Sequence, residues 1–572
     1  MQFATFAQYL AKIEATAKRN EITVILAELF NKLEPDEIEP TCWLLLGRIL
    51  PPYEGLEFQF AEKMVIRAVA RAFDSTPEKV QKQYKESGDL AKTAQEIRDK
   101  SIEVRKSITD IYAVLTAIAR ESGEGSQERK LAKVVELLQE LDSLSVRYIV
   151  RIILTKLRLG FSDMTILDAL SWAKVGDKSE RKLLEDTYQL KFDIGKLAKA
   201  YLVHGKNGLE HFDIELGIPI QPALCQRLKT PVEMIEKMKK VFAESKYDGT
   251  RVQIHIQRLE IRDKKLEKWT VRTFTRSMEE SSAQFPELEK AVQALGKHDL
   301  ILDCEAVGFD PKTNKLLPFQ ETIQRKRKHD VAEFSIKVPL RFFIFDVLYK
   351  DGKSLVRLPL SERKEILHKL PMDGKTLTES KFIITDSPDE LRSYHKKQLD
   401  LGLEGAVIKQ YDSVYQPGRR GWSWVKFKEE ETSEAKLSDT IDAVVMGYWY
   451  GKGKRNKFGV GAFLIGVAGK DEKILTLTKV GTGLSDDQWR ELKERCGKVV
   501  ATNKPANYHV NKMLAPDVWV DPEIVVEVAG DELTKSPNHT AGVALRFPRL
   551  VRFRDDKKVE QITTQKELAQ IS

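Results

Sequence analysis

The chain has little cysteine: four residues among 572, Cys42, Cys225, Cys304 and Cys496, and no two of them form a Cys-x-x-Cys pair. Their separation excludes the four-cysteine cluster of a structural zinc site and is typical of a protein in a reducing compartment. The chain also lacks an apolar run long enough to cross a membrane, and its N-terminus lacks the layout of a signal peptide. These absences predict a cytoplasmic protein with no membrane partner.

The excess of positive charge is small. Lysine and arginine number 94 against 86 aspartate and glutamate residues, which gives a net charge of +8 and an isoelectric point near 8.9. This balance does not by itself indicate a polyanionic partner, but it is compatible with nucleic-acid binding if the positive charge gathers on one face. The length allows about three or four domains, each with its own core.

Three regions differ in their hydrophobic pattern. Residues 1–216 show helical periodicity almost throughout, which predicts an all-α domain. An extended, proline-containing linker at Gly217–Pro222 leads into residues 217–436, in which strands alternate with helices, including a helix expected over 278–295. Residues 437–572 carry short strands between glycine-rich turns and predict a small β-barrel. The expected fold is therefore multidomain, with an all-α, an α+β and a C-terminal barrel domain.

Lys246 is a candidate catalytic group. It lies in the polar segment Glu244–Arg251, directly before the alternating run Val252–Ile256, and an Asp-Gly pair follows it closely. An amine attacks well only as the free base, so a nucleophilic lysine requires burial or nearby positive charge. The alternative is an ordinary hairpin turn, because Asp-Gly is among the commonest turn dipeptides.

Acidic and aromatic residues on two later strands are further candidates. Strand alternation places Asp303 and Glu305 on one face, where carboxylates can hold Mg²⁺ or a ribose hydroxyl; the alternative is a solvated strand face. The mostly apolar strand Phe342–Tyr349 carries several rings. One of them could form a platform for a base, whereas most must belong to the core.

Lysines near the end of the second region form another group. Lys409 closes the apolar run that follows Glu404, and an interior lysine is costly unless it is paired. Lys426 and Lys428 lie on one strand face, where they could bind a polyphosphate together with Lys409 or simply keep an edge strand soluble. The last basic run, Arg546–Lys557, suits a solvated or nucleic-acid-facing strand.

Six motifs follow one another along the chain: Lys-Tyr-Asp-Gly, Asp-Cys-Glu, Phe-Asp-Val-Leu-Tyr, Glu-Gly-Ala-Val-Ile-Lys, Trp-Val-Lys-Phe-Lys and Arg-Phe-Arg-Asp-Asp-Lys. In this order they resemble the motifs of the covalent nucleotidyltransferases, and most closely those of ATP-dependent DNA ligases of the archaeal and eukaryotic replicative type. The resemblance includes the Gly-Glu-Gly-Ser-Gln loop at 123–127 and the Arg-Phe-Pro-Arg segment at 546–549. It implies a helical DNA-binding domain over 1–216, an adenylation domain over 217–436 and an oligonucleotide-binding (OB-fold) barrel over 437–572.

The resemblance also implies a role for each matching residue. Lys246 would carry the adenylyl group, and Phe345 would stack on adenine. Glu305 and Glu404 would serve the metal and the ribose. The remaining positions expected to contact the nucleotide or a phosphate are Glu244, Arg251, Arg276, Lys409, Arg420, Lys426, Lys428, Arg554 and Lys557.

The implied reaction has three steps: attack of Lys246 on the α-phosphorus of ATP, transfer of AMP to the 5′-phosphate of a nick, and attack by the 3′-hydroxyl. Each step is an in-line transfer that depends on positioning and on charge neutralisation by Mg²⁺ or Mn²⁺. The implied partners are ATP and nicked double-stranded DNA, bound by a nucleoid-associated monomer. Because the motif at Arg554–Lys557 lies far along the chain from Lys246, a hinge is expected at Lys436–Asp439.

The sequence differs from several related families, and these differences disfavour other functions and partners. Archaeal relatives often carry a Gln-led, Phe-Phe segment that binds a sliding clamp, but residues 95–103 hold no phenylalanine, so a clamp partner would lack its usual motif. A capping guanylyltransferase or an RNA ligase is disfavoured by the long helical region, and an NAD-dependent ligase by the missing cysteine cluster. A nick-binding scaffold without catalysis is disfavoured because Lys246, Glu305 and Glu404 are all present.

Overall fold

A computed structural model of the chain describes residues 1–98, 105–157, 159–260, 267–322, 325, 335, 337–418, 420–428, 440–451, 455, 458–530 and 532–571. The chain forms two compact units, one from Met1–Val65 and Lys100–Glu429, the other from Ile66–Asp99 and Glu430–Ser572. The expected hinge at Lys436–Asp439 and part of the segment 95–103 lie outside the described residues. In the part of the chain that is described, no helix is both long and apolar enough to cross a membrane.

The N-terminal region is helical, as its periodicity predicts. Helix α7 begins with a capping box, in which Ser107 accepts from the N–H of Asp110 and Asp110 accepts from the N–H of Ser107. The helices are α1 (Phe3–Glu14), α2 (Arg19–Phe30), α3 (Ile38–Leu45), α4 (Glu62–Ala72), α5 (Pro77–Ser87), α6 (Leu90–Ile97), α7 (Ile108–Arg120), α8 (Ser126–Gln139), α9 (Ser143–Ile153), α10 (Asp163–Val175), α11 (Arg181–Leu190), α12 (Ile194–His204) and α13 (Asn207–Glu210).

The Gly-Glu-Gly-Ser-Gln loop before α8 is fixed by a single arginine. The Arg129 guanidinium donates to the carbonyls of Ser122 and Glu124 at 2.9 and 2.7 Å and to the Glu121 carboxylate at 2.7 Å. Gly125 adopts the left-handed conformation as the N-cap, so the helix begins at the residue after it. The loop therefore presents the first N–H groups of α8 in one defined conformation.

The linker at Gly217–Pro222 is fastened to strand β3 (Thr250–Glu260). The Gln253 side chain bonds both the N–H and the carbonyl of Ile220, at 2.8 and 3.1 Å. His255 accepts from the N–H of Gly217 through Nδ1 at 3.0 Å, and its Nε2 lies 2.9 Å from Oε1 of Gln253. An Nδ1 that accepts a hydrogen bond belongs to a neutral imidazole, so protonation of His255 would break the contact to the linker.

We expect acid to destabilise the first unit through His255. Burial, with a smaller contribution from Arg272, lowers the pKa of His255 to about 3 from an ordinary 6.5. Below pH 6.5 the unfolded chain binds a proton that the folded chain does not, so the free energy of unfolding falls by about 1.4 kcal/mol per pH unit until pH 3. In denaturant titrations between pH 6 and 4, His255→Gln should remove about this much of the slope. Equal slopes for the two proteins would contradict the prediction.

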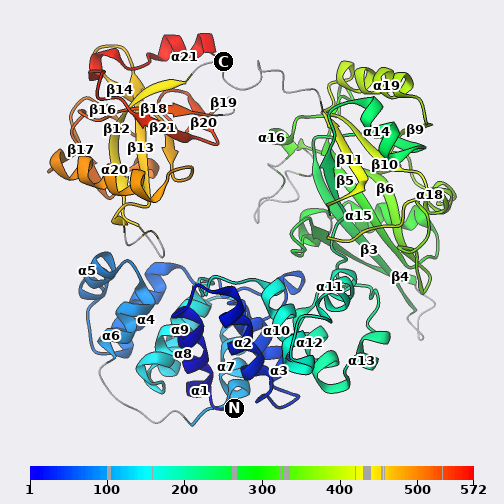
Figure 1. Cartoon of the computed structure of the whole chain (residues 1–572), viewed down its shortest axis with the longest axis horizontal. Coiled ribbons are helices and arrows are strands. Elements are labelled where there is room, and N and C mark those ends of the chain that lie inside the picture. The colour runs from blue at the N-terminus through cyan, green and yellow to red at the C-terminus, as the bar shows by residue number, and fades with distance from the viewer. Residues whose placement is uncertain are drawn as a thin grey trace. The chain divides into compact units, whose positions relative to one another are not determined.

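The middle region contains two sheets (Figure 1). The first has the order β1 (Leu224–Arg227), β11 (Arg420–Lys428), β10 (Gly405–Gln410), β2 (Val241–Ser245) and β9 (Phe382–Thr385). The second has the order β4 (Glu267–Thr275), β3, β5 (Leu300–Gly308), β6 (Leu340–Lys350) and β7 (Lys353–Ser354), and β8 (Leu377–Glu379) pairs with β6.

Helices cover both sheets. Met234 and Met238 of α14 (Pro231–Met238) and Leu391 of α19 (Pro388–Asp400) pack with the apolar residues of β2, β10 and β11. Leu367 of α18 (Leu360–His368) joins the core of the second sheet. A further apolar cluster, which includes Ile301 of β5, Leu348 of β6 and Trp424 of β11, joins the two sheets.

The continuous helix expected over 278–295 is wrong. That stretch holds η2 (Ser282–Gln284), α15 (Leu288–Ala291) and η3 (Val292–Leu295). Pro286 explains the break, because a proline disfavours helical backbone at the residue before it. Phe285 accordingly has φ −128° and ψ 57°, outside the helical region.

The C-terminal region is rich in strands, as predicted. Its central strand β12 (Ile441–Trp449) pairs with β13 (Ala462–Ala468), β17 (Val518–Val520) and β18 (Val525–Ala529). Trp489, Leu492 and Cys496 of α20 (Asp486–Lys498) belong to the core of this region. Its other elements are β14 (Ile474–Val480), β15 (Val500–Ala501), β16 (Tyr508–His509), β19 (Glu532–Lys535), β20 (Val543–Arg546), β21 (Arg549–Phe553) and α21 (Gln565–Ile571).

Candidate active site

Lys246 lies where the chain passes from one sheet of the middle region to the other. Strand β2 ends at Ser245 in the five-stranded sheet, and β3 begins at Thr250 in the second sheet. The strands on either side of the Asp-Gly pair are therefore not paired with each other. The segment is a crossover between sheets, and the hairpin alternative is wrong.

Close backbone contacts hold this crossover in place. The N–H of Lys246 donates to the carbonyl of Gly405 at 3.0 Å, and the N–H of Glu404 donates to the carbonyl of Lys246 at 3.1 Å. Gly405 has φ +117°, and a Cβ at Gly249 would lie 2.4 Å from a carbonyl oxygen of β5. Both positions therefore require glycine. The two backbone hydrogen bonds fix the Lys246 and Glu404 motifs to each other.

Glu404 joins two of the predicted cations. Its carboxylate pairs with the Lys246 ammonium and, at 3.0 Å, with Lys428. Burial acts to raise the pKa of Glu404, but the hydrogen bond from Lys246 and the contact with Lys428 hold it below its ordinary value. Burial and the charge of Lys428 lower the pKa of Lys426. The cluster carries more positive than negative charge, which suits a polyphosphate.

Arg251 is bound to neighbouring protein groups. Its Nε and Nη2 donate to the Asp303 carboxylate at 3.0 and 2.7 Å, and its Nη1 donates to the carbonyl of Ala223 at 2.6 Å. Burial acts to lower the pKa of Arg251, but the ion pair with Asp303 raises it above its ordinary value. Tyr415 also donates to Asp303, at 2.9 Å. Arg276 is exposed after β4 and lines a small pocket together with Arg251 and Asp303.

Glu305 is a half-buried carboxyl group on β5. Burial raises the pKa of Glu305 to about 8, although Arg251 and Lys246 act to lower it. Among the described residues, no three His, Cys, Asp or Glu side chains are grouped to hold a metal ion. Glu305 and Glu404 still fit Mg²⁺, because this ion is commonly held by one or two carboxylates together with substrate phosphates and water.

Aromatic rings and a buried lysine lie beside these charges. The ammonium of Lys409 lies 4.4 Å from the ring centroid of Phe345 and 4.1 Å from that of Trp424. Phe345 is half-buried, so part of its ring faces outward. Tyr247, next to the candidate nucleophile, stacks on Phe343 with centroids 3.9 Å apart. One ring of this strand thus fixes the crossover and another remains accessible, a distinction that the sequence pattern does not make.

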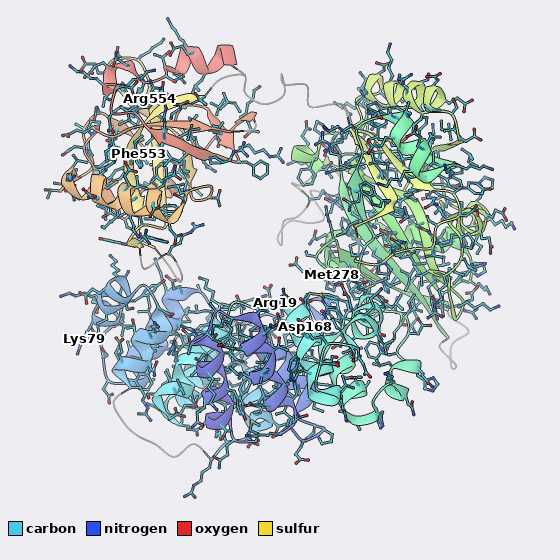
Figure 2. All side chains as sticks on the ribbon, in the orientation of Figure 1. Arg19, Lys79, Asp168, Met278, Phe553 and Arg554 are labelled. Atoms are coloured by element: carbon cyan, nitrogen blue, oxygen red, sulfur yellow. The ribbon has the colours of Figure 1, made fainter. Side chains whose placement is uncertain are left out.

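The last two predicted residues lie in the other compact unit. Arg554, which follows Phe553 (Figure 2), pairs with Asp442 at 2.9 Å and with Asp556 at 2.8 Å. Lys557 pairs with Asp442 at 2.5 Å. Asp442 therefore holds both cations of the motif. The side chain of Arg420, at the start of β11, is outside the described part of the chain.

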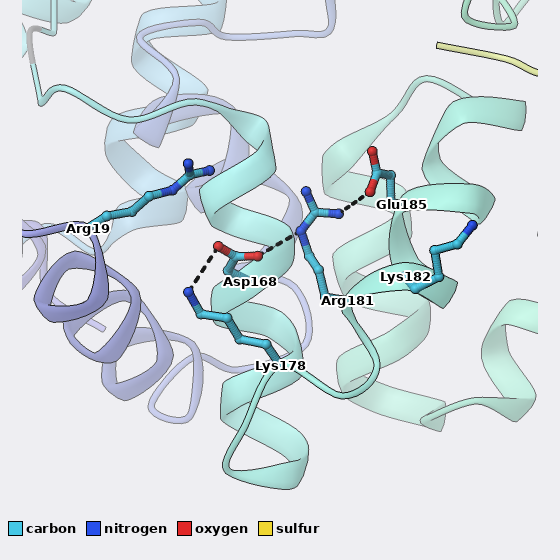
Figure 3. A pocket seen from close by; sticks show the side chains of 6 residues that line it. All are labelled: Arg19, Asp168, Lys178, Arg181, Lys182 and Glu185. Carbon is cyan, nitrogen blue, oxygen red and sulfur yellow. Dashed lines mark hydrogen bonds and ion pairs between the residues drawn. The ribbon is translucent and has the colours of Figure 1, made fainter. Parts of the chain in front are cut away.

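A separate charged pocket lies in the helical region (Figure 3). Asp168 pairs with Arg181 at 2.7 Å and with Lys178 at 3.3 Å, and Arg181 also pairs with Glu185 at 2.6 Å. The pocket is lined by Arg19, Asp168, Lys178, Arg181, Lys182 and Glu185. Its central cations are neutralised by carboxylates, so it is best described as an ion-pair network that joins α10 to α11.

Three groups that contact the predicted residues have no signal in the sequence motifs. Tyr415 binds Asp303, Asp442 binds Arg554 and Lys557, and Lys364 binds Glu244. Each of these residues lies more than 50 residues from its partner along the chain. Periodicity and local spacing therefore carry no information about these contacts. The only physical indication of such contacts is the general rule that a buried cation requires a paired carboxylate.

Comparisons with known proteins agree with this geometry. Residues 222–428 match the family described as ATP dependent DNA ligase domain, residues 2–171 match DNA ligase N terminus, and residues 456–557 match ATP dependent DNA ligase C terminal region. A "Probable DNA ligase" of Dictyoglomus thermophilum is 38% identical over 100% of this chain and 97% of its own. A "DNA ligase" of Staphylothermus marinus is 36% identical over 100% of this chain and 98% of its own.

The fold agrees as well. The solved structure "Pmar-Lig_Pre." has a TM-score of 0.54 at 16% identity and covers 96% of this chain and 99% of its own. A lysine at a crossover between two sheets, with a carboxylate and several cations around it, fits the class of covalent nucleotidyltransferases. The chain belongs to the ATP-dependent DNA ligase family. This family forms phosphodiester bonds through a covalent adenylate and uses ATP and a divalent metal, typically Mg²⁺.

Proposed function

We propose that this chain seals nicks in duplex DNA and that Lys246 is the residue that carries AMP. The observation that supports this most strongly is the position of Lys246, which the backbone of Gly405 fixes at the crossover between the two sheets. Its ammonium must lose a proton before attack, and the ion pair with Glu404 holds the Lys246 side chain in place beside the cations Lys426 and Lys428. Lys426 and Lys428 neutralise charge on the phosphates as pyrophosphate leaves.

The remaining groups of the middle region position the nucleotide. Phe345 offers a partly accessible ring face to the base, and Lys409 lies against the same ring. Arg251, held by Asp303, stiffens the crossover and borders the pocket that Arg276 lines. We assign Arg276 to the 5′-phosphate of the nick, because it is the exposed cation of this pocket.

Glu305 and Glu404 are the groups that would hold Mg²⁺. When bound, the ion would neutralise phosphate charge and orient the reacting oxygens. A carboxyl group whose pKa is raised by burial gains from a nearby cation, and Glu305 is such a group. The residues present therefore fit the metal that the family uses.

We further propose three functional domains, with boundaries near residues 216 and 436. The helical region would bind DNA phosphates, the middle region would carry the adenylate, and the C-terminal region would bring Arg554 and Lys557 to the pyrophosphate. The matched family segments 2–171, 222–428 and 456–557 support these boundaries. We propose a monomer, and we assign no sliding-clamp partner.

The C-terminal region also offers a candidate DNA contact. Phe547 is 58% exposed and has φ +50°, an uncommon backbone conformation for an aromatic residue. The Arg546 guanidinium lies 5.1 Å from its ring centroid, in the basic run that the sequence suggests for nucleic acid. An exposed ring among arginines can pack against bases or in a minor groove while the arginines bind phosphates.

Phe547→Ala is expected to weaken binding of nicked duplex DNA at least about fivefold, the lower end of the loss for one aromatic contact with a base. Formation of the lysyl-AMP should not change. Fluorescence anisotropy at one fixed salt concentration measures the first quantity, and a labelling assay measures the second. Met513→Ala, which removes another exposed apolar side chain of the same unit, is the matched control. DNA affinity equal to that of the wild type would refute the contact.

The proposed function is tested by incubating the full chain with labelled ATP, ADP, GTP or NAD, followed by denaturing electrophoresis. We expect a labelled protein band with ATP and none with NAD. Sealing of nicked DNA but not of nicked RNA would separate a DNA ligase from an RNA ligase. Label from GTP alone would favour a guanylyltransferase, and no label from any nucleotide would refute the enzyme.

A further inference from the structure

Two of the residues expected to contact the nucleotide, Glu244 and Lys409, form a buried cluster of charges with a third residue, Lys364. The Glu244 carboxylate pairs with two lysines: its Oε1 lies 2.8 Å from the ammonium of Lys364, and its Oε2 lies 2.9 Å from that of Lys409. Glu244 is 2% exposed, Lys364 is 4% exposed and Lys409 is 1% exposed. One negative charge is therefore shared by two positive charges in a region with little water, where each partner depends strongly on the others.

Lys364 reaches this cluster from α18, outside all six motifs. The residue before it, Arg363, is bound to Asp346 at 2.8 and 3.1 Å and is not available to Glu244. The ammonium of Lys364 also lies 4.9 Å from the ring centroid of Phe382 on β9. Among the described residues, the ion pair found for Lys364 is the one with Glu244. Its charge is thus directed at the residue two positions before the candidate nucleophile.

The two oxygens of the Glu244 carboxylate face different lysines, and this restricts the position of the Lys409 ammonium. Because the Lys364 ammonium lies 2.8 Å from Oε1, turning the carboxylate so that both oxygens face Lys409 would separate this buried ion pair. Lys409 is left with one oxygen and with the ring faces of Phe345 and Trp424, 4.4 and 4.1 Å away. Without Lys364, a bidentate contact with Glu244 would draw the Lys409 ammonium away from these rings.

We propose that Lys364 is a positioning residue for ATP: by holding one oxygen of Glu244, it fixes Lys409 against the ring of Phe345 that receives the base. This inference rests on the proposed function, in which Lys246 is adenylylated beside that ring. Lys364, a residue of α18, thus influences the affinity for ATP although it does not itself touch the nucleotide. It also explains why a second lysine is buried beside a carboxylate that already has one.

The test is the rate of lysyl-AMP formation by the full chain as a function of ATP concentration. Lys364→Met keeps the length of the side chain and removes its charge, which leaves a neutral Glu244–Lys409 pair. We expect its KM for ATP to rise about tenfold while kcat changes less than about threefold, because ground-state positioning is lost and the nucleophile is not. Lys364→Arg should restore most of the affinity. Lys369→Met, an exposed lysine at the end of the same helix, should behave as the wild type.

A second comparison separates positioning from general damage. In a Glu244→Gln background, Lys364→Met should add less than about a twofold change in KM, because the group through which it acts has already been altered. An unchanged KM in the single variant, or equal additional losses in both backgrounds, would overturn the inference. If the wild type forms no lysyl-AMP, the proposed function itself fails. If the wild type is labelled and Lys364→Met has the KM of the wild type, only the positioning role fails.

Discussion

Lys246→Ala is expected to abolish labelling of the protein by ATP and to slow nick sealing by more than about a thousandfold, as is usual when a covalent nucleophile is removed. The amine of Lys246 is the group that must attack phosphorus, and the crossover holds it within contact of Glu404. The third step needs only the 3′-hydroxyl and an AMP already on the DNA. The variant should therefore still seal a nick that carries a preformed 5′-adenylate, at a measurable fraction of the wild-type rate.

Lys240→Ala is the matched control for this experiment. Lys240 is an exposed lysine directly before β2, and its ammonium lies over the ring of Tyr411. Its replacement should leave labelling and sealing unchanged. Labelling of Lys246→Ala at the wild-type level would show that another residue carries the AMP, and loss of labelling in both variants would indicate damage to β2 and not loss of the nucleophile.

The order and type of the main elements are predictable from the sequence because they follow local patterns. Helical periodicity marks the N-terminal region, and short, mostly apolar runs mark β5 and β10, the strands that carry Glu305 and Lys409. Errors arise where one residue overrides a pattern. Pro286 breaks the helix expected over 278–295, because it disfavours helical backbone at Phe285.

The candidate site is less predictable than the strands that carry it, because its contacts cross between sheets. The motifs indicate which residues have catalytic chemistry, but not that Glu404 pairs with both Lys246 and Lys428 or that Arg251 is bound to Asp303. The Asp-Gly pair illustrates the limit of local reasoning. Its composition is that of a hairpin turn, yet β2 and β3 belong to different sheets, and only the long-range pairing of β2 with β10 reveals this.

Lys557→Ala is expected to slow formation of the lysyl-AMP about a hundredfold while sealing of a preadenylylated nick stays within about threefold of the wild type. Lys557 and Arg554 lie in a different compact unit from Lys246 and are held there by Asp442. If they orient the leaving pyrophosphate, they act only in the step in which pyrophosphate leaves. Loss of one charge-assisted contact to a developing phosphate anion is commonly worth two to three orders of magnitude, roughly 3–4 kcal/mol.

Lys558→Ala removes the neighbouring exposed lysine and is the control for the change in net charge. It should leave both rates unchanged, because Asp442 holds Lys557 and Arg554 as a pair. Single-turnover measurements of each step distinguish the outcomes. Equal slowing of adenylylation and of the final sealing step by Lys557→Ala would mean that Lys557 contributes to DNA binding or to the stability of the C-terminal region, and the assignment to pyrophosphate would be wrong. Slowing confined to the first step requires that the unit carrying Lys557 reach the nucleotide on Lys246 for that step alone, which is the movement that the expected hinge would provide.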